Sequence, residues 1–138
     1  MRDQIFVDSL FVIALINRRD QYHPQASALV RSLSGRPLLT TDVVLLEIGN
    51  GLARSYRSEA AGVLERFLSS GDVKIVHMDP FLFERALDLY KKHQDKTWGL
   101  IDCVSFVVML EEGIHEALTF DRHFAQAGFE VLMREQPM

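Results

Sequence analysis

The segment QIFVDSLFVIALIN, residues 4–17, decides the fold class of this chain because a strand-like run is followed directly by a helix-like run, with one acid between them. The run 5–7 is typical of a short buried strand, and residues 9–17 have the length and composition of a helix. Asp8 lies at the junction of the two. A buried carboxylate costs free energy unless a partner offsets it. The sequence therefore predicts that Asp8 has a specific partner.

Strand-like and helical segments alternate along the rest of the chain. We expect strands near residues 4–7, 38–40, 73–78, 117–120 and 129–132. We expect helices over 9–17, 23–35, 41–56, 58–68, 79–93 and 100–112, and a short one after Asp121. This alternation predicts an α/β fold with a mainly parallel sheet of about four to five strands, helices on both faces and right-handed crossovers.

Length and composition favour a single compact domain over residues 1–138. The chain is 48% hydrophobic, which is not typical of a disordered protein. The longest apolar run, 10–16, is too short to cross a bilayer, and Asp3 and Asp8 interrupt any signal-peptide pattern. A single cysteine, Cys103, excludes an intrachain disulfide and a multi-cysteine zinc site. We expect a cytoplasmic protein that is not associated with a membrane.

Four acids stand out because each lies in or beside a segment built for burial. Asp8 and Asp121 each follow an expected strand, and ligands of parallel sheets bind beyond the carboxyl ends of the strands. Glu47 lies within DVVLLEIGNGLAR, residues 42–54, and Asp102 within WGLIDCVSFVVML, residues 98–110. If the two strands are neighbours, the first two carboxylates meet in one crevice.

Each acid also has a simpler interpretation. Asp8 and Asp121 could cap the helices that follow them, and Glu47 could lie on the solvent face of its helix. Asp102 could sit in the first turn of a helix, where the helix dipole favours a negative charge. These separate roles do not explain why four acids share the same apolar setting.

Clustered carboxylates raise one another's pKa, and a divalent cation between them removes that repulsion. Oxygen ligands without cysteine or paired histidine favour Mg²⁺, with Mn²⁺ as the second choice. Such a site suits phosphodiester hydrolysis. A bound cation would also reconcile a polyanionic substrate with a net charge of −4.

At these residues the sequence resembles the PIN-domain nucleases, and among them the VapC-type toxin ribonucleases of toxin–antitoxin pairs. The first family motif, a strand ending in Asp and then Ser or Thr, resembles FVDSLFVIALIN, residues 6–17. The second resembles TTDVVLLEIGNGLAR, residues 40–54. The third and fourth resemble DKTWGLIDCVSFVVMLEEGIHEALTFDRHFAQAGFEVL, residues 95–132. The resemblance covers nearly the whole chain.

This resemblance implies a three-layer PIN-like fold and a Mg²⁺-dependent endoribonuclease. It also implies a cognate antitoxin and a homodimer. The apolar residues Phe81, Phe83, Leu87 and Tyr90 are compatible with a dimer interface and equally with the core. The implied metal ligands and catalytic residues are Asp8, Glu47, Asp102 and Asp121. Three further residues are candidates for supporting these acids or for touching RNA: Ser9, Ser105 and Arg122.

The chain departs from the family pattern in the fourth motif. Many relatives have a second acid two residues after the first, and here TFDRHF places His123 at that position. This leaves one metal or two as alternatives. His123 could contact substrate, or it could serve as a cap or pack beside Phe124.

Two other functions remain open from the sequence. The first is a phosphoacceptor, receiver-like Mg²⁺ domain, which expects paired acids after the first strand and a lysine after a late one. Here Asp8 is single, and Asp121 stands where the lysine would be. The second is a catalytically silent module that keeps the fold for binding, which the presence of all four acids disfavours.

Overall fold

The computed structural model describes residues 3–134 and contains a parallel sheet of five short strands. The strands are β1 (Ile5–Val7), β2 (Leu38–Thr41), β3 (Val73–Val76), β4 (Glu116–Leu118) and β5 (Glu130–Val131). Their order is β3-β2-β1-β4-β5, and every pair is parallel. The predicted α/β class with a parallel sheet is confirmed. Strand β1 lies between β2 and β4, so a side chain at its end is close to both neighbours.

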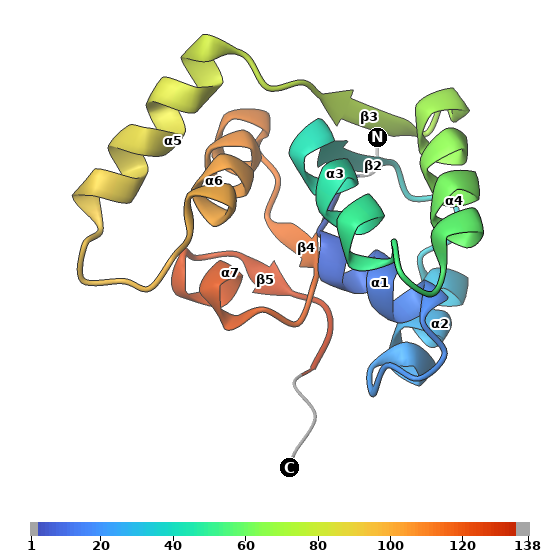
Figure 1. Cartoon of the computed structure of the whole chain (residues 1–138). Coiled ribbons are helices and arrows are strands. Elements are labelled where there is room, and N and C mark those ends of the chain that lie inside the picture. Colours follow the sequence, from blue (N-terminus) through green and yellow to red (C-terminus); the bar gives the residue numbers. More distant parts are fainter. Residues whose placement is uncertain (1–2, 135–138) are drawn as a thin grey trace.

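The helices form two groups, which Figure 1 shows to the right and to the left of β4. The first group consists of α1 (Ser9–Ile16), α2 (His23–Ser32), α3 (Asp42–Gly51) and α4 (Arg57–Ser69), which are linked by contacts with one another. The second group consists of α5 (Pro80–Lys92), α6 (Leu100–Glu112) and α7 (Arg122–Gln126), which are linked in the same way. Right-handed crossovers place these groups on opposite faces of the sheet. None of the helices within residues 3–134 is long and apolar enough to span a membrane.

Aromatic packing holds the second group of helices against the sheet. Phe6 of β1 and Phe106 of α6 both pack on Phe124 of α7, with ring centroids 6.1 and 5.0 Å apart. All three side chains are at most 1% exposed. Burial of a side chain of this size contributes about 1.5–3 kcal/mol. This packing fixes the ends of β1, α6 and α7 relative to one another, and these ends carry three of the four acids.

Two elements end earlier than the sequence predicts. Helix α3 ends at Gly51 rather than near Tyr56 because its last residues, 49–51, are Gly-Asn-Gly, which are poor helix formers. Strand β3 ends at Val76 rather than Met78. The partner strand β2 ends at Thr41, opposite Val76, and beyond this pair the Met78 N–H donates to both carboxylate oxygens of Asp42, at 3.0 and 3.2 Å.

The prediction that Asp121 directly follows a strand is wrong. Strand β4 ends at Leu118, so Thr119 and Phe120 lie between the strand and Asp121. Because Thr119 leaves the ladder, its side chain can turn toward β1. The first helix pair also differs slightly from expectation: α2 ends at Ser32, and Gly35 follows in a turn with a φ of 85°.

Candidate active site

Asp8 occupies the N-cap position of α1 but does not cap it, since its side chain makes no capping hydrogen bond. Its Oδ2 instead accepts a 2.8 Å hydrogen bond from the Thr119 hydroxyl, which follows the neighbouring strand. Asp8 is 7% exposed. The capping interpretation is therefore wrong for Asp8, and the partner that the sequence required is in part Thr119.

Burial raises the pKa of Asp8 from 3.8 to about 7. The hydrogen bonds from Thr119 and from the Ser9 backbone oppose this rise, and the negative charges of Glu47 and Asp121 add to it. A neutral hydrogen bond from a hydroxyl does not supply the positive charge that would favour ionisation. At neutral pH, Asp8 is poised between its protonated and ionised forms.

Glu47 projects from α3 toward Asp8, and the two acids together are called the inner pair. Burial raises the pKa of Glu47, and the negative charges of Asp102 and Asp121 raise it further. The side chain of Ser9, which is 6% exposed, forms a hydrogen bond to Glu47 that opposes this rise. The Ser9 side chain thus holds the rotamer of Glu47, and the Ser9 backbone forms a hydrogen bond to Asp8.

Asp102, Asp121 and His123 form the outer group, in which one ligand atom from each residue lies within 4.8 Å of the others. His123 Nδ1 is 3.0 Å from Asp102 Oδ2 and 3.4 Å from Asp121 Oδ1. All three side chains are 22–28% exposed. The histidine therefore stands between the two carboxylates and can offset part of their charge when it is protonated.

Backbone N–H groups orient both acids of the outer group. Asp102 Oδ2 accepts from the N–H of Gly99 at 3.0 Å, and Asp121 Oδ1 accepts from the N–H of His123 at 2.9 Å. Both acids therefore cap helices, as the simpler interpretation expects, and they face the cluster at the same time. The ring of His123 is fixed on its far side, where Nε2 lies 3.1 Å from the Thr97 hydroxyl.

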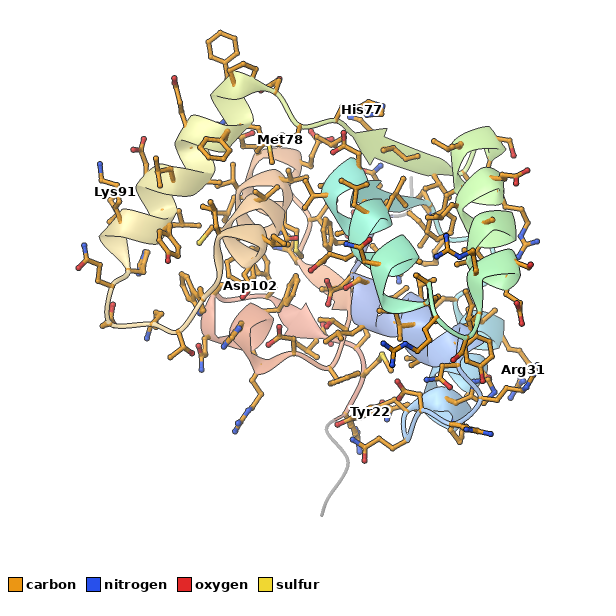
Figure 2. All side chains as sticks on the ribbon, in the orientation of Figure 1. Tyr22, Arg31, His77, Met78, Lys91 and Asp102 are labelled. Atoms are coloured by element: carbon orange, nitrogen blue, oxygen red, sulfur yellow. The ribbon has the colours of Figure 1, made fainter. Side chains whose placement is uncertain are left out.

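The four acids meet in one place. Their charges act on one another across both parts of the cluster, since Asp121 raises the pKa of Asp8 and of Glu47, and Asp102 raises that of Glu47. Figure 2 places Asp102 at the start of α6, in the centre of the molecule between the two groups of helices. An open pocket of about 310 Å³, lined by residues that include Asp121 and His123, gives the outer group access to solvent.

The three weaker candidates from the sequence, Ser9, Arg122 and Ser105, differ in whether they reach the acidic cluster or its pocket. Ser9 contacts Glu47, as described. Arg122 is exposed at the start of α7 and lines the same 310 Å³ pocket as Asp121. Ser105 lies one turn beyond Asp102 but is only 2% exposed, so its hydroxyl does not reach the surface where RNA would lie.

Sequence reasoning missed two hydroxyl residues, Thr119 and Thr97. The spacing of Thr119, two residues before Asp121, was a usable signal: its hydroxyl accepts from the Asp121 N–H at 3.1 Å and donates to Asp8. Thr97 carried no signal, because its contact with His123 spans 26 residues.

A model of the PIN domain matches residues 5–130. The chain belongs to the PIN-domain family. It is 34% identical over 127 residues to the 23S rRNA-specific endonuclease VapC20 of Mycobacterium tuberculosis, in strains CDC 1551 and H37Rv, and the match covers 91% of this chain and 95% of the relative. These matches confirm the predicted family and support the predicted class, a nuclease of the toxin type.

Solved structures support the same assignment of this PIN-domain protein. The crystal structure of M. tuberculosis VapC20, described as a sarcin–ricin loop cleaving toxin, superposes with a TM-score of 0.80 at 31% identity and covers 91% of this chain and 95% of that one. FitAcB from Neisseria gonorrhoeae superposes with a TM-score of 0.60 at 19% identity, over 92% and 95% of the two chains. The second match shows the fold alone, and both agree with the predicted PIN-like fold.

Proposed function

We propose that this PIN-domain protein is a single-domain, divalent-metal-dependent endoribonuclease toxin, and that ribosomal RNA is the first substrate to test. The observation that carries this proposal is the convergence of Asp8, Glu47, Asp102 and Asp121 from four different elements. A structural role does not require four acids in one place, two of which, Asp8 and Glu47, have their pKa raised by burial and by the neighbouring negative charges. The likeness to VapC20 supports the choice of ribosomal RNA.

The residues of the cluster suit a hard divalent cation. They supply carboxylate oxygens and one imidazole, a donor set that favours Mg²⁺ or Mn²⁺. Burial leaves Asp8 with a pKa of about 7, so a nearby cation would shift it toward the ionised form at neutral pH. When bound, a divalent cation offsets charge on the phosphate and lowers the pKa of water.

Each residue of the cluster has a defined part in this proposal. Asp8 and Asp102 are the first candidates for direct metal ligands, because one ends the central strand and the other begins α6. Glu47, oriented by Ser9, and Asp121, oriented by the backbone of His123, hold the metal or its waters. Such orienting contacts commonly raise metal affinity and activity by roughly 10–100-fold.

The protein partners are part of the same proposal. We infer a cognate antitoxin that covers the acidic cluster, as the VapC-type resemblance implies, and a cytoplasmic location in which RNA is available. We also infer a homodimer through α5. Its apolar side chains Phe81, Phe83, Leu87 and Tyr90 are 37–70% exposed, and an exposed apolar stripe of this kind is typical of an interface.

The deciding experiment is to map cleavage sites on total RNA with the purified protein, in Mg²⁺ and in chelator. We expect cleavage only with the metal, and a loss of about a thousand-fold or more in Asp8→Asn, since this removes several kcal/mol of charge stabilisation. Asp88→Asn, an exposed acid of α5, is the matched control. Unchanged cleavage by Asp8→Asn would contradict the assignment of the acidic cluster as the active site.

The experiment also separates the two alternative functions. A folded protein that binds RNA but never cleaves it in Mg²⁺ or Mn²⁺ would favour the silent binding module. Stable phosphorylation of an aspartate by a small phosphodonor would favour the receiver-like domain, which membership of the PIN-domain family does not support.

A further inference from the structure

A second polar pocket, outside the acidic cluster, has a volume of about 630 Å³. It lies where α1 and α3 end, and three arginines line it: Arg18, Arg19 and Arg54. The polar side chains of Asn17 and Ser55 line it as well. We call this feature the arginine pocket.

Local structure brings the three arginines to one place. After α1 the chain forms a tight turn, in which the Asn17 side chain accepts from the Arg19 N–H at 3.0 Å. After α3 a helical turn carries Arg54, and the Tyr56 N–H closes this turn on the carbonyl of Leu52 at 3.0 Å. The backbone on both sides of the pocket is therefore held by hydrogen bonds.

The packing of α1 on α3 sets the floor of the arginine pocket. A Cβ added at Gly51 would lie 2.7 Å from Ile13 Cδ1, which is too close. Glycine at this position leaves room for the Ile13 side chain between α1 and α3. Leu52, which is 2% exposed, anchors the next turn in the core.

The arginine pocket carries uncompensated positive charge in a protein of net charge −4. Some cations elsewhere are paired: Arg36 with Glu116, Lys74 with Glu112 and Arg85 with Glu111. Within residues 3–134, no ion pair involves the three pocket arginines. One acid, Glu59, lies among the lining residues.

The pocket lies within reach of a strand that crosses the acidic cluster. Helix α1 has eight residues between Ser9 and Ile16. At 1.5 Å per residue, this places the pocket roughly 12 Å from Asp8, a span of a few nucleotides. Helix α3 leads from Glu47 to the same pocket, so both elements that carry the inner pair end there.

We propose that the arginine pocket binds backbone phosphates of the RNA a few nucleotides from the bond that is cleaved. This inference rests on the proposed function. An acidic centre in an acidic protein repels RNA, so affinity must come from local basic sites. Guanidinium groups suit this role because they bind phosphate oxygens in a bidentate geometry.

An acidic segment of a protein partner is the other candidate for this charge. Tight protein docking uses buried aromatic or aliphatic anchors. The pocket instead presents mainly guanidinium, amide and hydroxyl groups; its aliphatic side chain Leu52 is buried in the core, and its aromatic ring, Tyr56, is half-buried against the core. The lining therefore favours RNA.

The test is the salt dependence of RNA binding. A fluorescein-labelled single-stranded oligoribonucleotide is titrated with the full chain in chelator, which prevents cleavage. Each lost phosphate contact lowers the slope of log K against log salt by about 0.7. We expect a fall of about 0.7 in Arg54→Gln or Arg18→Gln, about 1.4 in the double variant, and none in Arg66→Gln, an exposed arginine of α4 outside the pocket.

The outcomes distinguish the pocket from the proposed function. If pocket variants and Arg66→Gln share the wild-type slope, the pocket proposal is wrong even when Mg²⁺-dependent cleavage is normal. If RNA binding depends on the pocket but no cleavage occurs in metal, the proposed function fails and the pocket stands. Loss of antitoxin binding with an unchanged slope would assign the pocket to a protein segment, which overturns the proposal. Circular dichroism checks folding, and Arg19→Gln replaces any variant that unfolds.

Discussion

The two parts of the acidic cluster manage negative charge in different ways. The inner pair, Asp8 and Glu47, is buried or half-buried, and burial raises the pKa of both acids although hydrogen bonds from uncharged groups oppose the rise. The outer group is partly exposed, and its two acids face the imidazole of His123. The inner pair has no basic side chain among the groups that contact it, whereas the acids of the outer group contact an imidazole.

This difference suggests an order of events at the site. The outer group meets solvent first and can hold a cation at its surface. Nearby positive charge favours the ionised form of the inner pair, because burial disfavours its charged form. Three experiments separate the two parts of the cluster.

The largest expected effect concerns stability without metal. In the unfolded chain Asp8 ionises near pH 4, but in the folded protein it stays protonated until about pH 7. The stability of the folded state therefore falls as pH rises between these values, by up to about 4 kcal/mol from this residue, and is level above them. Asp8→Asn has no carboxyl group at this position, so its stability does not fall with pH in this way. We expect its unfolding free energy in chelator to equal or exceed that of wild type at pH 8.

Urea unfolding of both proteins in chelator, between about pH 4 and pH 8, measures this difference. Asp88→Asn should follow the wild-type curve, because the residue is exposed on α5. Parallel curves for Asp8→Asn and wild type would show that burial of Asp8 carries no such cost. Addition of Mg²⁺ or Mn²⁺ should restore the wild type more than the variant.

The next effect concerns the outer group. His123→Ala removes the group that orients Asp102 and fills the space between the two carboxylates. We expect roughly 10–100-fold weaker Mn²⁺ binding, the usual effect of losing an orienting contact. His123→Asn keeps an amide donor near the position of Nδ1 and should retain most of the affinity. Calorimetric titration with Mn²⁺ measures both, and equal binding by His123→Ala and wild type would contradict the role of this residue.

The smallest effect concerns the link between the two parts. The 2.8 Å hydrogen bond from Thr119 lowers the pKa of Asp8, and Thr119→Val removes this hydrogen bond. We expect the pH of half-maximal cleavage to rise by about one unit, the equivalent of one hydrogen bond to a charged group. Thr119→Ser keeps the hydroxyl and is the control. A pH–rate profile of Thr119→Val that overlays the wild type would argue against this link.

Local sequence was sufficient to predict the elements and the four acids. The apolar residues on both sides of Asp8 indicated burial, and Glu47 and Asp102 were recognisable as single acids in apolar helices. The errors occurred at element ends. Local glycines end α3 at Gly51, whereas long-range contacts form just beyond β3 and β4: Met78 donates to Asp42, and Thr119 reaches Asp8, and neither partner is adjacent in sequence.

The sequence alone determined the alternation of strands and helices, because hydrophobic periodicity acts over a few residues, and with it the apolar setting of each acid. Only the tertiary structure decided which groups meet. The bond from Thr119 to Asp8 spans 111 residues, and the arginine pocket joins the ends of two helices. Such contacts depend on strand order and helix packing, so no local pattern records them.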